Sequence, residues 1–247
     1  MRVEYSNADR SRPAFHIHED VHGHIWVHPY GGGFSYFDRD RNCLVPFYDD
    51  LGSNNWRFSK QIHAAFSDKQ GNLWVGLKDG MIRLYDSNRK FIRHLTGNGT
   101  ISMTGTPMEG TAYFIMQDSK GIIWIATKGN GLVRAEQISP TSMSYKLTRY
   151  QHDSNDMYSL SDNNVYCVYE DHHGRIWAAT FAGGINYISQ GEHGETVFIN
   201  HRNNLKGYPI DVCYKARFIT SDNNGRLWVG TTTGAVAFDE NFKKPED

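Results

Sequence analysis

Short apolar and aromatic segments, each bounded by polar turn residues, recur along the whole chain. The clearest set begins with residues 165–169 and continues with segments at 175–180, 185–188 and 197–200. Polar or glycine-rich turns separate these segments. Apolar runs of this length, punctuated in this way, predict β-strands joined by hairpins and longer loops. The set therefore predicts one sheet of four antiparallel strands.

One seven-residue pattern, Asp-x-x-Gly-x-(Ile/Leu)-Trp, spans the turn between the first and second predicted strands and occurs five times. Successive Trp residues of the pattern are separated by 48, 50, 53 and 51 residues. The Asp is expected to accept a hydrogen bond from the backbone two residues later, and the Gly to adopt the positive φ that closes a hairpin. The five Asp and Trp pairs are Asp20 and Trp26, Asp68 and Trp74, Asp118 and Trp124, Asp171 and Trp177, and Asp222 and Trp228.

A strand-forming repeat of about 50 residues is typical of a β-propeller blade. We therefore predict a single all-β repeat domain, a β-propeller of about five four-stranded antiparallel blades, with the motif Trp packed between adjacent blades. An unpaired strand edge invites association with another strand. Two arrangements are therefore possible, a closed small ring or a part of a larger propeller. In a closed ring, residues 2–6 are the candidate strand that completes the last blade. The predicted blades are approximately 14–59, 60–107, 108–158, 159–207 and 208–247.

Charge and composition narrow the classes of function. The formal net charge is -1 with interspersed signs, which does not favour a nucleic-acid partner. No run approaches the ~20 apolar residues of a membrane-spanning helix, so we expect no direct membrane insertion of this chain. Three cysteines give no disulfide framework or metal-ligand spacing, and the first residues show no secretory signal. We expect no cofactor.

Segments 66–86, 169–189 and 221–240, together with the lead-in at 159–171, closely resemble the two-component regulator propeller repeat. This resemblance implies the periplasmic sensor region of a bacterial hybrid two-component system, which binds oligosaccharides and has no catalytic activity of its own. The chain has fewer repeats than is usual in that family. Further blades or a second chain are therefore expected partners, beside the oligosaccharide ligand.

Candidate ligand-binding residues follow from aligning the repeats on the motif Asp. Residues five positions before it are expected to share one face of the inner strand with those three positions before it, because side chains alternate along a strand. The loop that enters the inner strand and the loop between the second and third strands emerge at the same end of a blade. The strand candidates are His63, Tyr113, Tyr166 and Arg217, and the loop candidates are Tyr30, Trp56, Lys78, Lys128 and Phe181, with Arg57, Asn130, Tyr208 and Asp211 as further loop residues.

Three other interpretations stay open. The segment 16–28 holds five histidines, of which His16 and His18 have a spacing that can present two metal ligands, but a third ligand is not evident and no metal site is predicted. A propeller lyase or glycoside-cleaving enzyme is the alternative to the sensor, since its active groups would come from loops. A protein-interaction scaffold is the third possibility.

Overall fold

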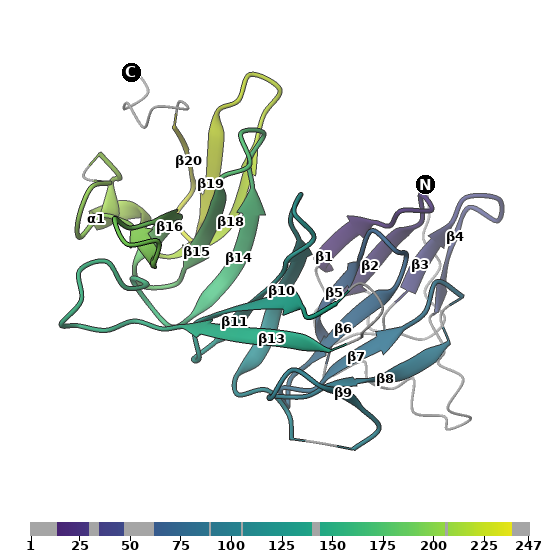
Figure 1. Ribbon diagram of the computed structural model, residues 1–247. Coiled ribbons are helices and arrows are strands. Elements are labelled where there is room, and N and C mark those ends of the chain that lie inside the picture. The colour runs from purple at the N-terminus through teal and green to yellow at the C-terminus, as the bar shows by residue number, and fades with distance from the viewer. Residues whose placement is uncertain are drawn as a thin grey trace. The chain divides into compact units, whose positions relative to one another are not determined.

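The computed structural model contains five antiparallel sheets, and in each sheet the strands follow one another in chain order (Figure 1). The first sheet comprises β1 (Ala14–Glu19), β2 (Ile25–Pro29), β3 (Ser35–Asp38) and β4 (Cys43–Pro46). The second comprises β5 (Ile62–Ser67), β6 (Leu73–Leu77), β7 (Ile82–Tyr85), β8 (Phe91–Leu95) and β9 (Ile101–Ser102). The structure describes residues 14–29, 35–46, 62–88, 90–104, 106–139, 144–205 and 207–238.

The third sheet comprises β10 (Thr111–Gln117), β11 (Ile123–Lys128), β12 (Leu132–Gln137) and β13 (Tyr145–Tyr150). The fourth comprises β14 (Val165–Glu170), β15 (Ile176–Thr180), β16 (Gly184–Gln190) and β17 (Thr196–Ile199). The fifth comprises β18 (Ala216–Ser221), β19 (Leu227–Thr231) and β20 (Ala235–Phe238). Within the described ranges the single helix is α1 (Ile210–Cys213), and no helix there is long and apolar enough to cross a membrane.

The prediction of an all-β chain with five propeller blades is confirmed. Three sheets have the expected four strands. The second gains the short strand β9, because residues 101–102 pair back onto β8. The fifth has three described strands, and the candidate completing strand at 2–6 lies outside the described residues.

The motif turn has the same backbone geometry in all five blades. Its Gly has a positive φ each time, from 74° at Gly174 to 85° at Gly121. One oxygen of the motif Asp accepts the N–H groups of the residues two and four positions later, at 2.8 to 3.0 Å. The turn therefore forms as the sequence predicts, with a second backbone bond in addition.

The other carboxylate oxygen of the motif Asp binds the motif Trp. The indole Nε1–H donates to Oδ2 at 2.9 Å in the first four blades and at 3.0 Å in the fifth. Each Asp thus satisfies three donors and ties the hairpin turn to the second strand, an arrangement that we call the Asp–Trp clasp. The clasp is the reason that Asp and Trp keep a constant spacing in the motif.

The residue two positions before the Trp adds a fourth donor to several clasps. The side chains of Arg175, Arg226 and Asn72 donate to the carboxylate at 2.6, 2.9 and 3.0 Å. His24 Nδ1 lies 3.1 Å from Asp20 Oδ2. Polar side chains at this position therefore have a structural role in the turn.

Four of the five clasped Trp residues are buried, and two of them share an apolar cluster with a neighbouring blade. The chain packs into two compact units, Met1–Ala112 with Ile138–Tyr145, and Tyr113–Gln137 with Lys146–Asp247. In the first unit, Trp26 shares an apolar cluster with Ala65 of the second blade. In the second unit, Trp177 shares a cluster with Ile219 of the fifth blade. This packing agrees with the predicted position of the Trp.

The clasp lowers the pKa of its carboxylate where a shift is resolved. At Asp171, burial alone would raise the pKa, but hydrogen bonds from Trp177 and Arg175 outweigh it and the pKa falls below the ordinary value. At Asp20 burial likewise acts to raise the pKa, but the hydrogen bonds from Trp26 and His24 outweigh it and the pKa is lowered. At Asp222 the bond from Trp228 dominates and lowers the pKa to about 2.

We expect Asp171→Ala to lower the free energy of unfolding by about 3 kcal/mol, because buried N–H groups lose their acceptor. Asp171 is 5% exposed and Trp177 fully buried, whereas Trp228 of the fifth clasp is 38% exposed. Water can therefore replace the carboxylate at the fifth clasp, and Asp222→Ala is the matched control with a smaller loss. Urea unfolding of both variants measures the difference, and equal losses would contradict a role for burial.

We also expect stability to fall in acid. The pKa of an unfolded Asp is about 3.9, and the folded pKa of Asp20, Asp171 and Asp222 lies lower. The unfolded chain therefore binds protons first, so the stabilisation is complete above about pH 5 and is lost from there down to about pH 2. Urea midpoints between pH 6 and pH 2 test this. The Asp222→Asn variant should show a shallower dependence on pH, and an unchanged dependence would argue against the clasp as its source.

Candidate functional site

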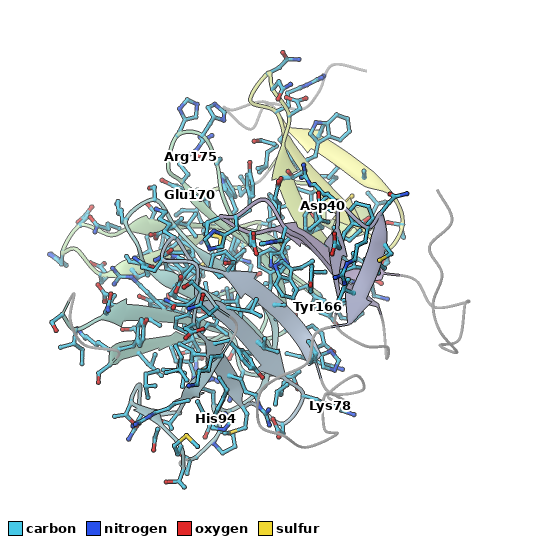
Figure 2. All side chains as sticks on the ribbon, turned by 90° about the vertical axis from the view of Figure 1, so that its right-hand side faces the viewer. Asp40, Lys78, His94, Tyr166, Glu170 and Arg175 are labelled. Carbon is cyan, nitrogen blue, oxygen red and sulfur yellow. The ribbon has the colours of Figure 1, made fainter. Side chains whose placement is uncertain are left out.

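Three inner strands of the second unit carry a large side chain near their start, five positions before the motif Asp. These residues are Tyr113 on β10, Tyr166 on β14 and Arg217 on β18. In Figure 2, Tyr166 and Glu170 mark the two ends of β14, and Arg175 of the motif turn lies on the Glu170 side. The residues of this column therefore lie at the end of the blade opposite the clasp.

A β-bulge sets Tyr166 and Arg217 apart from their neighbours, and it does the same for His63 in the first unit. The register of β14 against β15 shifts around Tyr166, that of β18 against β19 around Arg217, and that of β5 against β6 around His63. The extra residue of a bulge is not paired with a residue of the neighbouring strand, and its side chain points in a different direction from that of a regular strand. The strict alternation assumed in the sequence analysis is therefore wrong across this point, and the bulge residue is released from the face that packs the core.

Three aromatic rings of the second unit, those of Tyr113, Tyr166 and Phe181, meet at this end of the blades. The ring centroids of Tyr113 and Tyr166 are 4.9 Å apart, in an edge-to-face arrangement. Phe181 follows β15, and its ring centroid lies 5.6 Å from that of Tyr166. Its backbone N–H donates to the carbonyl of Asn164 at 2.9 Å, which ties the turn to the loop before β14. All three rings are half-buried.

Three cationic side chains lie against these rings. Arg217 Cζ is 4.2 Å from the ring centroid of Tyr166 and 4.8 Å from that of Phe181. Lys215 Nζ is 5.3 Å from the Phe181 centroid, and Lys128 Nζ is 6.0 Å from the Tyr113 centroid. Such contacts are within the range of cation–π attraction.

We call this group the cation–aromatic cluster, and it draws on three consecutive blades. Its rings form an apolar wall, and its lysine and arginine side chains supply N–H donors. An apolar wall with a few polar groups is the usual composition of a small-molecule site. The members are Tyr113, Lys128, Tyr166, Phe181, Lys215 and Arg217.

The structure brings together five of the nine main candidates from the sequence, which are the four strand residues and the first five loop residues. Of the other four, His63 and Lys78 belong to the first unit, where the Lys78 carbonyl accepts a hydrogen bond from Thr111 at 2.7 Å. Tyr30 and Trp56 lie outside the described residues, as does Arg57.

Tyr208 has a packing role, and its choice as a loop candidate is wrong. It is 4% exposed, and its ring stacks on Phe238 at a centroid distance of 5.4 Å. Its hydroxyl donates to the Cys213 carbonyl at 2.6 Å, and burial raises its pKa. Asn130 is engaged by its neighbours, because its side-chain oxygen accepts a hydrogen bond from Gln151 at 2.6 Å.

Lys215 is the member of the cluster that the sequence analysis missed. It lies between α1 and β18, and Nζ also approaches the ring of Tyr214, at 5.1 Å from the centroid. The alternating Tyr-Lys-Ala-Arg order of residues 214–217 is a weak signal. It shows two cations close together, but it does not show which way either points.

The histidine-rich segment of the first blade takes part in the clasp and its packing. Besides the contact of His24 with Asp20, the His18 ring stacks on Trp26 with a centroid separation of 6.3 Å. The side chains of His16 and His28 are outside the description. Within the ranges that the structure covers, no three His, Cys, Asp or Glu side chains are grouped to hold a metal ion.

Comparison with known sequences identifies the repeat. Residues 159–182 match the family described as Two component regulator propeller. Histidine kinase P4 of Formosa agariphila is 32% identical over 111 residues, which are 45% of this chain and 8% of that protein. The resemblance to the two-component regulator propeller repeat is thus confirmed, and the chain spans a small part of the length of this relative.

Comparison with solved structures supports the fold. A protein described as the extracellular domain of a hybrid two component system from B. thetaiotaomicron has a TM-score of 0.68 at 21% identity, covering 98% of this chain and 29% of that one. A catalytically inactive virginiamycin B lyase from Staphylococcus aureus, with quinupristin, has a TM-score of 0.63 at 13% identity, covering 97% of this chain and 72% of that one. At these identities the likeness shows the propeller fold alone.

Substitution of a packing residue and of a candidate site residue should lower the free energy of unfolding by different amounts. We expect Tyr208→Ala to lower the free energy of unfolding by about 3 kcal/mol, because a buried ring is lost. Arg217→Ala should cost less than about 1 kcal/mol, since an exposed cation–π contact is weak. Urea unfolding of the two variants tests this. An equally large loss for Arg217→Ala would make Arg217 a packing residue.

Proposed function

We propose that this chain is a ligand-binding sensor module of a bacterial two-component signalling system, that it recognises oligosaccharides, and that it has no catalytic activity of its own. The observation that carries the proposal is the cation–aromatic cluster, built at the free end of three blades. The matched repeat and the histidine kinase relative support the signalling context.

The chemistry of the cluster favours binding over catalysis. Its side chains are tyrosine, phenylalanine, lysine and arginine, and neither a carboxylate nor an imidazole is among its members. Aromatic rings offer apolar faces to the C–H groups of a sugar, while N–H groups donate to its oxygen atoms. General acid–base cleavage of a glycosidic bond ordinarily uses a pair of carboxyl groups.

Binding would produce a signal through the position of the blades. A ligand shifts a conformational equilibrium only as far as its affinities for the two states differ. The cluster draws one side chain from each of three inner strands, so a ligand that contacts all three depends on how these blades are arranged. We infer that a change in that arrangement is what the remainder of the signalling protein would detect.

We place the module outside the cytoplasmic membrane, in the periplasm. The family resemblance implies this location, and the similar B. thetaiotaomicron structure is described as an extracellular domain. Released oligosaccharides would reach a binding site there without entering the cell.

The proposal predicts a thermal shift without turnover. An oligosaccharide that binds the native chain should raise the melting temperature in a concentration-dependent way, and chromatography should recover it intact. The Tyr166→Ala variant should bind about tenfold more weakly, or ~1.4 kcal/mol, because it removes the central ring. Tyr158→Ala is the control, since Tyr158 is an exposed tyrosine of the same unit outside the cluster.

Two results would contradict the proposal. A ligand that is recovered cleaved would favour the propeller lyase or glycoside-cleaving enzyme. A complete absence of binding across neutral and acidic oligosaccharides would favour the interaction scaffold.

A further inference from the structure

The three cations of the cluster have no anionic partner among the described residues. Lys128 and Arg217 are exposed and Lys215 is half-buried, and the contacts found for their charged groups are those with aromatic rings. Three like charges that gather without a counter-ion repel one another, and a bound anion would relieve that repulsion.

The neighbouring carboxylate is already engaged. Asp162 lies in the loop before β14, and one of its oxygens accepts the backbone N–H of Ala182 at 3.0 Å. Its other oxygen accepts a hydrogen bond from the Asn164 side chain at 3.2 Å. These bonds hold the loop beside Phe181. Asp162 therefore helps to position the Phe181 ring and is not paired with the cations of the cluster.

Arg217 occupies the aromatic surface that a neutral sugar would need. Its guanidinium carbon contacts two rings, at 4.2 Å from the Tyr166 centroid and 4.8 Å from the Phe181 centroid. A pyranose cannot stack where the guanidinium lies unless it displaces that group. The rings restrict the guanidinium instead, and its N–H donors stay available for a ligand.

This arrangement suits an oxyanion. A guanidinium presents its donors in a planar fork that matches the two oxygens of a carboxylate or sulfate, and partial immobilisation reduces the entropy lost on binding. Lys215 and Lys128 add two further positive charges. Their distances to Phe181 and Tyr113 place all three cations around one group of rings.

We propose that the cation–aromatic cluster is an oxyanion receptor, and that the ligand of this module is an acidic oligosaccharide that carries carboxylate or sulfate ester groups. The inference rests on the proposed sensor function and narrows its ligand class. Arg217 makes the paired contact, Lys215 and Lys128 provide the flanking charge, and the three rings orient the cations.

The test is isothermal titration of the full chain with an array of neutral, uronate-containing and sulfated oligosaccharides. The array includes chondroitin tetrasaccharide with and without its sulfate esters, which separates the two oxyanions on one backbone. We expect an acidic oligosaccharide to bind, and its affinity to fall at least tenfold between 50 and 200 mM NaCl because several charges are neutralised. Neutral oligosaccharides should not compete.

Variants locate the receptor on the chain. Arg217→Gln and Lys215→Gln should each weaken binding of the acidic ligand at least tenfold, while Arg217→Lys, which keeps the charge but loses the fork, should fall between wild type and Arg217→Gln. Lys146→Gln is the matched control, because Lys146 is an exposed lysine of the same unit on β13, outside the cluster. Thermal melts confirm that each variant is folded.

The outcomes distinguish this inference from the proposed function. Binding of a neutral oligosaccharide alone would overturn the oxyanion receptor and keep the sensor. Acidic binding that Lys146→Gln weakens as much as Lys215→Gln would also overturn it, since the attraction would then be diffuse. Failure of every oligosaccharide to bind would overturn both.

Discussion

The structure depends on one carboxylate in each repeat. The motif Asp accepts two backbone N–H groups through one oxygen and the indole N–H of the motif Trp through the other. This single side chain closes the hairpin, satisfies the polar edge of a large buried ring and holds that ring at the interface between blades. A buried indole N–H without an acceptor would be costly, so the clasp makes the burial of the Trp compatible with the apolar cluster around it.

The clasp also leaves the opposite end of the blade free to vary. Packing is concentrated around the Trp and the middle of the inner strand, where Cys167 and Val168 are each 1% exposed. The bulge then releases the residue near the start of the strand from the ladder. Tyr166, Arg217 and His63 all stand at this point, although they are chemically unlike. The fold therefore tolerates chemically different side chains at this position of the inner strand.

A propeller fold does not determine a function, as the likeness to both an extracellular signalling domain and a lyase illustrates. The functional argument comes from the cluster. Its rings are partly covered by its own cations, so the groups that it presents to a ligand are N–H donors and positive charges. That property distinguishes this chain from a propeller that would present bare aromatic rings to a neutral sugar.

The sequence by itself determined the blades, because the interactions that build them are local. The Asp and the Trp of a clasp are six residues apart, and hairpin strands follow one another directly, so both appear as a fixed spacing and an apolar pattern. Tyr113, Tyr166 and Arg217 could be aligned as one column for the same reason. Only the tertiary structure revealed the Trp–Asp bond, the bulge, the packing role of Tyr208 and the membership of Lys215. These features depend on side-chain directions and on contacts between distant residues, such as that of Arg217 with Tyr166, about 50 positions away. The periodicity of a sequence does not show which of two distant side chains lies over the other.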